Sequence, residues 1–223
     1  MSGPHEVLGM SRLLGVSTTE FLALYSDNSG TTLRSEADGR CVFVAPNGCR
    51  VHPRRPLVCR LYPLGRVTDE AGEERFGLFD REPGCEAETG REGTIETFLE
   101  SQGVAPYLEW SRRYGEVYRR MMGLLDRLGL DGETRASDGH DGGREEASGQ
   151  AGPTEEAAPE ARVGQPDRAL VSSWQDIDAS LADYCAAKGL PVPDGIEASI
   201  DLHVQAMSEW LDDLESRLGP ASD

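Results

Sequence analysis

The sequence lacks several features that define common classes of protein. Its 223 residues contain no apolar run of about 18 residues, the length that a helix needs to cross a bilayer, so a membrane-spanning helix is not expected. Residues 1–6 do not combine a basic region with an apolar core, so we expect no secretory signal and predict a cytoplasmic protein. Only 38% of the residues are hydrophobic, which predicts that part of the chain lies outside a packed core.

Positive charge is also scarce, and it is unevenly distributed. The net charge is −18, and Lys188 is the single lysine. Residues 1–130 carry a net charge of −3 and residues 131–223 carry −15, so the acidity belongs to the C-terminal part. Because such a surface repels phosphate groups, neither nucleic acid nor an anionic membrane is an expected partner.

The sequence pattern changes twice along the chain and predicts three regions. Residues 1–130 combine helical periodicity with a loop-rich stretch that contains cysteines. Residues 131–169 are rich in glycine, acids, proline and alanine and have no aromatic residue, which predicts a disordered acidic linker. Residues 170–223 are predicted to form a pair of helices. The expected fold class is therefore α+β, mostly helical, with a small loop-rich region around the cysteines.

Local signals place the elements of the first region. A short helix is expected over 6–14, and a second begins at Ser17, where Ser17 and Glu20 form a capping box. A strand is expected over 75–79, and helices over 94–102 and 105–129. Apolar side chains along the last helix recur at three- and four-residue steps, which predicts a buried stripe. Its members are Tyr107, Tyr114, Val117, Tyr118, Met121, Leu124, Leu125 and Leu128.

The two helices expected within 170–218 are too small to bury a core alone. We therefore expect them to dock on the first region or on a protein partner. Cys185 lies on an apolar helical face and is predicted to be a buried, inert thiol. His203 stands beside the apolar stripe of the second helix and is predicted to lie at its boundary or on the surface.

The other four cysteines are Cys41, Cys49, Cys59 and Cys85, separated by 7, 9 and 25 residues. Because cytosolic thiols stay reduced, a disulfide framework is not the preferred interpretation. Four thiolates can close a tetrahedral zinc site or hold an iron–sulfur cluster. However, the sequence has no Cys-x-x-Cys pair, so the spacing alone leaves metal binding and four buried structural cysteines equally open.

Arginine is concentrated around these cysteines. Five arginines fall within 17 residues: Arg50, Arg54, Arg55, Arg60 and Arg66. Four thiolates around Zn²⁺ leave a net charge of about −2, and guanidinium donors would offset that charge and orient the sulfur atoms. We predict this supporting role for Arg55 and Arg60. Ordinary surface ion pairs and the binding of an external anion are the alternatives.

The stretch from Cys41 to Pro63 combines spaced cysteines with Arg55-Pro56 and Cys59-Arg60. It resembles the YkgJ-type cysteine-cluster family, described as zinc- or iron-chelating, which shows the same Arg-Pro and Cys-Arg motifs at this spacing. Residues 8–25 are similar to the helical lead-in of that family, and Cys85 with residues 90–98 is similar to its final cysteine and following helix. The resemblance covers residues 6–122. It implies a zinc or iron ion, or an iron–sulfur cluster, with the four cysteines as ligands.

The sequence departs from that family at its start. The family carries a dense Cys-x-x-Cys-x-x-Cys-Cys cluster before the lead-in helix, whereas no cysteine precedes Cys41 here. We expect either a true start upstream of Met1 or a member that has lost half of its ligands. In the first case, three or four sulfur atoms should converge on a gap near the start of the 6–14 helix. A shared metal requires those sulfur atoms to lie within about 4 Å of one another.

Two other functional classes remain open. A flagellin lysine methylase carries a similar cysteine cluster, so a metal-dependent protein-modifying enzyme is one alternative by resemblance. The other is an adaptor that binds a protein partner through residues 170–218. No common nucleophile, phosphate-binding, dinucleotide-binding or zinc-protease motif is present, so no catalytic residue is predicted.

Overall fold

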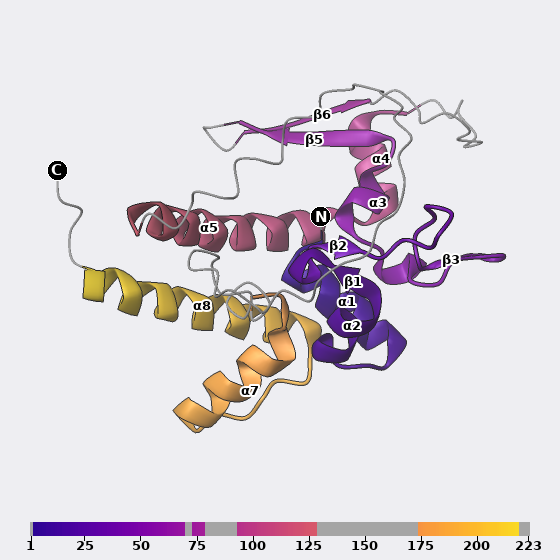
Figure 1. Cartoon of the computed structure of the whole chain (residues 1–223). Coiled ribbons are helices and arrows are strands. Elements are labelled where there is room, and N and C mark those ends of the chain that lie inside the picture. The colour runs from indigo at the N-terminus through magenta and orange to yellow at the C-terminus, as the bar shows by residue number, and fades with distance from the viewer. Residues whose placement is uncertain (1, 70–72, 79–92, 129–173, 219–223) are drawn as a thin grey trace, which may run out of the picture.

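The computed structural model describes residues 2–69, 73–78, 93–128 and 174–218 (Figure 1). The predicted linker, 131–169, and Cys85 lie outside the described residues. Helices dominate the described part and are joined by three small antiparallel sheets of two strands each. The predicted α+β class, mostly helical, is therefore confirmed.

Seven α-helices are described. They are α1 (Pro4–Leu14), α2 (Thr18–Tyr25), α3 (Leu57–Leu61), α4 (Ile95–Gln102), α5 (Ala105–Arg127), α7 (Ile177–Lys188) and α8 (Ile196–Leu218). The paired strands are β1 (Ser26–Asp27) with β2 (Thr32–Leu33), β3 (Val44–Ala45) with β4 (Gly48–Cys49), and β5 (Leu64–Thr68) with β6 (Glu74–Leu78). Two short 3₁₀ helices, η1 (Asn28–Gly30) and η2 (His52–Arg54), complete the set. Helices α1, α4 and α5 and the strand β6 each lie within two residues of their expected bounds, and α2 begins one residue after Ser17.

The corner between α1 and α2 is set by local sequence signals. Gly15 adopts a left-handed conformation at φ 71°, which ends α1 at little steric cost. Ser17 then accepts a hydrogen bond from the Glu20 amide, and the Glu20 carboxylate accepts one from the Ser17 amide. The predicted capping box is therefore confirmed.

The larger of two hydrophobic cores is built on α5. Its buried members come from α1, α3, α5, α7 and α8 and from the segments just before α5 and α7: Leu8, Leu57, Leu61, Val104, Tyr107, Leu108, Trp110, Tyr114, Val117, Leu124, Trp174, Ile177, Leu181, Ile200 and Leu211. The predicted stripe is confirmed for its four buried members, but Tyr118 and Leu128 are each 46% exposed. In Figure 1 the β5–β6 hairpin and α8 lie on opposite sides of α5.

A smaller core lies on the other side of α1. It consists of Val7, Met10, Phe21, Phe43 and Val51. The Phe21 and Phe43 rings are stacked with their centroids 5.9 Å apart. Cys41 and Cys49 pack against the edge of this core, which fixes the loop-rich region next to α1.

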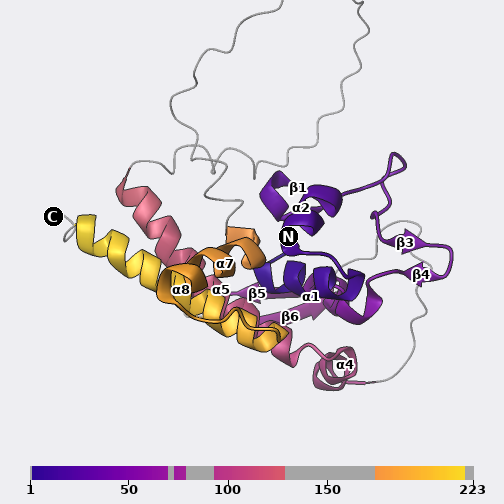
Figure 2. The ribbon, with the colours of Figure 1, turned by 90° about the horizontal axis from the view of Figure 1, so that it is seen from below.

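Helices α7 and α8 dock on the N-terminal elements (Figure 2). Helix α8 runs along α5, and α7 contacts α2. Their apolar side chains belong to the larger core, so the pair is buried against its own chain. The domain boundaries given above stay a prediction.

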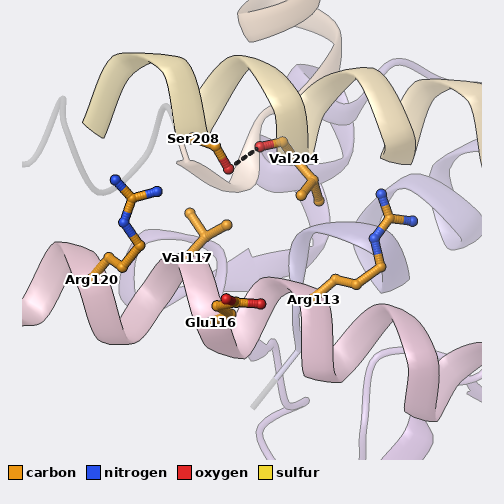
Figure 3. A pocket seen from close by; sticks show the side chains of 6 residues that line it. All are labelled: Arg113, Glu116, Val117, Arg120, Val204 and Ser208. Atoms are coloured by element: carbon orange, nitrogen blue, oxygen red, sulfur yellow. Dashed lines mark hydrogen bonds between the residues drawn. The ribbon is translucent and has the colours of Figure 1, made fainter. Parts of the chain in front are cut away.

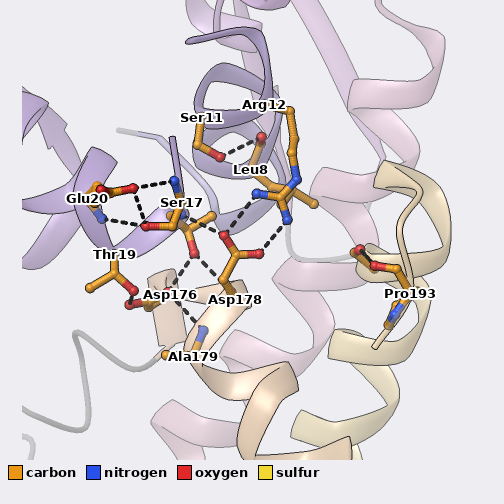
Figure 4. A network of polar contacts seen from close by, with 12 residues as sticks. Leu8, Ser11, Arg12, Ser17, Thr19, Glu20, Asp176, Asp178, Ala179 and Pro193 are labelled. Atoms are coloured by element: carbon orange, nitrogen blue, oxygen red, sulfur yellow. Dashed lines mark hydrogen bonds and ion pairs between the residues drawn. The ribbon is translucent and has the colours of Figure 1, made fainter. Parts of the chain in front are cut away.

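A polar network holds the start of α7 against α2 (Figure 4). Asp176 accepts hydrogen bonds from the hydroxyls of Thr18 and Thr19, at 2.5 and 2.6 Å, and from the Ala179 amide at 3.2 Å. Asp178 pairs with Arg12 of α1. Because Asp176 is 9% exposed, its carboxylate oxygens depend on these donors for their hydrogen bonds, and the network fixes where the helix pair docks.

The prediction for His203 is wrong. The side chain is 0% exposed rather than at a boundary or on the surface. It faces α5, where its Nδ1 lies 2.9 Å from the Tyr114 hydroxyl. Cys185 is 1% exposed, so its predicted burial is confirmed.

No single helix in the described ranges is long and apolar enough to cross a membrane. Helices α1 and α2 meet the criteria of length and composition only when taken together, across a 94° bend.

We expect the Asp176→Ala substitution to destabilise the protein by about 2–4 kcal/mol. It removes the cap of α7 and leaves the hydroxyls of Thr18 and Thr19 without their acceptor. Urea unfolding of the full chain at neutral pH measures the effect. Asp213→Ala is the matched control, since Asp213 is exposed and its ion pair is with Arg217, one turn away on the same helix. The control should change stability by less than about 0.5 kcal/mol. Equal losses in the two variants would show that the network does not hold the helix pair.

Candidate metal centre

The described candidate ligands come from three separate elements. Cys41 forms an isolated antiparallel bridge with Ser35. Cys49 ends β4 and pairs with Val44 of β3. Cys59 lies in the middle of α3. All three are free thiols, and Cys59 is the exposed one.

The three thiols share one electrostatic environment. The pKa of the Cys59 thiol is raised, first because the sulfur is partly desolvated and then because Cys41 and Cys49 are near enough to oppose a second negative charge. The Cys59 residue as a whole is nevertheless exposed, so solvent reaches one side of the three thiols. The fold thus brings together three segments that are up to 18 residues apart in sequence.

The described ranges alone do not hold a completed metal site. No group of three or more His, Cys, Asp or Glu side chains within them is arranged to hold a metal ion. The expected convergence of the sulfur atoms on one ion is therefore not found within these ranges. The donor set itself suits zinc and iron, because both accept thiolate ligands. The fourth candidate, Cys85, stays a prediction.

Arg55 lies next to the thiols. Its Nη1 donates a hydrogen bond to the His52 carbonyl at 2.8 Å, and its Nη2 donates one to Oε1 of Gln102 at 2.6 Å. These two anchors hold the guanidinium near Cys59 and Cys49, where its charge opposes the rise in the pKa of the Cys59 thiol. The arrangement fits the support predicted for Arg55.

Arg60 has a different set of partners from the one predicted. Its side chain is buried, and its guanidinium donates to the carbonyl oxygens of Arg55, Gln102 and Pro53. It also donates to the Tyr107 hydroxyl and lies 4.1 Å from the centre of that ring. Arg60 therefore ties α3 to η2 and to the start of α5, rather than donating to sulfur.

The other arginines near the cysteines test the alternative that this cluster forms ordinary surface ion pairs. Arg66 pairs with Glu74 at 3.8 Å and donates to the Ser111 hydroxyl. Arg50 and Arg54 have no carboxylate partner within the described part of the chain. Residues 39–68 contain six arginines and no acidic residue, although the chain as a whole carries −18. Surface ion pairing does not account for this local concentration of positive charge.

The role of Glu6 was not predicted from the sequence. This residue is 4% exposed in α1, and its carboxylate accepts hydrogen bonds from the amides of Leu57, at 2.5 Å, and Gly3, at 2.8 Å. The pKa of Glu6 is raised because desolvation outweighs these bonds. Leu57 is the first residue of α3, so Glu6 caps the helix that carries Cys59. An acidic residue beside Val7 and Leu8 is the only trace of this in the sequence.

A groove of about 220 Å³ lies elsewhere, between α5 and α8 (Figure 3). Its lining consists of Arg113, Glu116, Val117, Arg120, Val204 and Ser208. Both arginines already pair with acids of α8, so the groove offers no free positive charge to an anionic ligand.

Residues 10–86 match the model of a family described as "CxxCxxCC: Putative zinc- or iron-chelating domain". The match includes Cys41, Cys49, Cys59 and Cys85 and leaves out Cys185. It confirms the resemblance to the cysteine-cluster family for this segment. No curated protein and no solved structure matches the chain.

We expect Arg60→Lys to destabilise the protein by about 2–4 kcal/mol, because lysine keeps the charge but cannot reproduce the fork of hydrogen bonds to backbone carbonyls. Arg50→Lys is the control, since Arg50 is exposed and its side chain has no described partner. Urea unfolding should show a change below about 0.5 kcal/mol for the control. If Arg60→Lys were as stable as the control but lost bound metal, Arg60 would act on the thiolates instead.

Proposed function

We propose that residues 10–86 form a zinc- or iron-binding module in which Cys41, Cys49 and Cys59 are ligands and Cys85 is the fourth. The observation that carries the proposal is the match of residues 10–86 to a chelating family. Three free thiols of that segment, on a β-bridge, a hairpin and a helix, are also near enough for Cys41 and Cys49 to raise the pKa of Cys59. All four cysteines lie inside the segment that matches a chelating family.

The chemistry of the donors supports a soft or borderline metal. Thiolates bind zinc at about 2.3 Å and also hold iron and iron–sulfur clusters. The bound metal would supply a cross-link between segments that have little hydrophobic core of their own. The protein contributes the ligands, the Glu6 cap on α3 and the fixed Arg55 guanidinium.

Local charge supports the same proposal. A tetrathiolate zinc site leaves a net charge of about −2, which nearby arginines offset. Arg55 is held beside two of the thiols, and Arg50 and Arg54 are not neutralised by a described carboxylate. A reducing compartment, such as the cytoplasm predicted from the sequence, would keep the thiols available as ligands.

Metal analysis of the full chain after anaerobic purification tests this function. We expect bound zinc or iron, with visible absorption and a brown colour if the metal is an iron–sulfur cluster and no colour if it is zinc. Cys59→Ser and Cys49→Ser should each lower the metal content strongly, because each removes one ligand of a shared site.

Cys185→Ala is the control for that experiment. Cys185 is buried in α7, where its sulfur lies 3.6 Å from the Pro191 carbonyl oxygen, so its loss should leave the metal content unchanged. A full chain that is folded, contains no metal and does not take up added zinc or iron would contradict the proposal.

A further inference from the structure

Two buried histidines meet one tyrosine where α1, α5 and α8 pack together. His5 of α1 is 4% exposed and lies among Tyr107, Trp110 and Tyr114 of α5. Its ring is stacked on Tyr114 with centroids 5.6 Å apart and planes 15° apart. Neither ring nitrogen of His5 has a hydrogen-bond partner among the described residues.

His203 reaches the same tyrosine from α8. It is 0% exposed, and its Nδ1 lies 2.9 Å from the Tyr114 hydroxyl. Trp174, just before α7, meets the Tyr114 ring edge-on at 5.7 Å. We call His5, Tyr114 and His203 the histidine–tyrosine cluster. It joins the N-terminal helix to the C-terminal helix pair through a single ring.

The charged groups that face the cluster do not offset the positive charge of a protonated histidine ring. Arg66 of β5 repels a proton on His5. Glu6, beside His5, already accepts the Leu57 and Gly3 amides. Asp176 is the acid that faces His203, and it already accepts the hydroxyls of Thr18 and Thr19.

The tyrosines that face the cluster do not supply a negative charge either. Burial raises the pKa of Tyr114 well above its usual range, so this hydroxyl stays neutral. The Tyr107 hydroxyl accepts a hydrogen bond from Arg60. Both histidine rings are therefore stable in the folded protein only as neutral groups.

We infer that the histidine–tyrosine cluster is an acid-sensitive latch, which releases α7 and α8 from α1 and α5 when His5 and His203 become protonated. The latch lies outside the candidate metal centre and does not depend on the proposed function. Opening α8 uncovers His203 directly, and it uncovers the Tyr114 ring on which His5 is stacked.

The two lowered pKa values determine how the stability of docking changes with pH. Burial lowers the pKa of His5 to about 3 and that of His203 to about 4, against 6.5 for an exposed histidine. Docking is therefore fully stable above about pH 6.5 and loses stability as the pH falls toward the two lowered values. Between about pH 7.5 and about pH 5.5, each histidine should weaken docking about tenfold, and the two together about a hundredfold.

Hydrogen exchange of the full chain, followed by mass spectrometry at these two pH values and corrected for intrinsic rates, tests the latch. Acidification should lower the protection of α8 amides about a hundredfold. Amides around Phe43 and Val51, in the smaller core, should keep their protection. His203→Asn, which keeps a polar atom near the Tyr114 hydroxyl, should reduce the pH effect to about tenfold. His5→Phe, which keeps the stacking, should reduce it equally, and the double variant should abolish it.

His52→Asn is the control, because His52 is exposed in η2 and should leave the pH effect unchanged. Three results would each overturn the inference. The first is α8 protection that does not change with pH. The second is an equal loss around Phe43 and Val51, which would mean global unfolding rather than release of the helix pair. The third is a double variant that keeps the pH dependence of the original chain.

Discussion

The burial of α1 is the constraint on which the rest of the structure depends. Residues 4–11 of this helix are all buried, so it is enclosed by other elements rather than lying on the surface. Leu8 belongs to the larger core, whereas Val7 and Met10 belong to the smaller one. Helices α2, α5 and α8 and the 3₁₀ helix η2 all contact it. The loop-rich region with the cysteines and the C-terminal helix pair are therefore both positioned relative to α1, on opposite sides of it.

Each polar side chain on the buried part of this helix needs either hydrogen-bond partners or a neutral form, because an unpaired charge in an apolar environment is costly. His5 and Glu6 meet this requirement in two ways. Glu6 meets it with donors, since the amides of Leu57 and Gly3 bind its carboxylate, and it thereby holds the start of the helix that carries Cys59. His5 meets it by staying neutral against Tyr114. Neighbouring residues of one helix thus connect the candidate metal centre and the docked helix pair.

Features encoded over a few residues were predictable, and features that depend on distant partners were not. The Ser17–Glu20 capping box needs four consecutive residues, and the α5 stripe follows from helical periodicity alone. Periodicity tells on which face of its helix a side chain lies but not which other element covers that face. The burial of His203 against α5 was therefore not predicted. Arg60 could not be placed either, because two of its partners, the Gln102 carbonyl and Tyr107, lie more than 40 residues away. The grouping of the cysteines came from family resemblance, since irregular loops link them and spacing alone left it open.

The distribution of charge explains how a strongly acidic chain can keep a positive region beside its thiols. Acids of α8 are used locally: Asp201 pairs with Arg113, while Asp212 and Glu215 pair with Arg120. These pairs lie along the docked face of α5, whereas residues 39–68 contain six arginines and no acid. Because surface charges are screened over about 8–10 Å at physiological salt, the net charge of the whole chain matters less at the cysteines than the arginines next to them. Arg55 is one of these arginines, and its charge opposes the rise in the pKa of the Cys59 thiol that burial and the neighbouring cysteines cause.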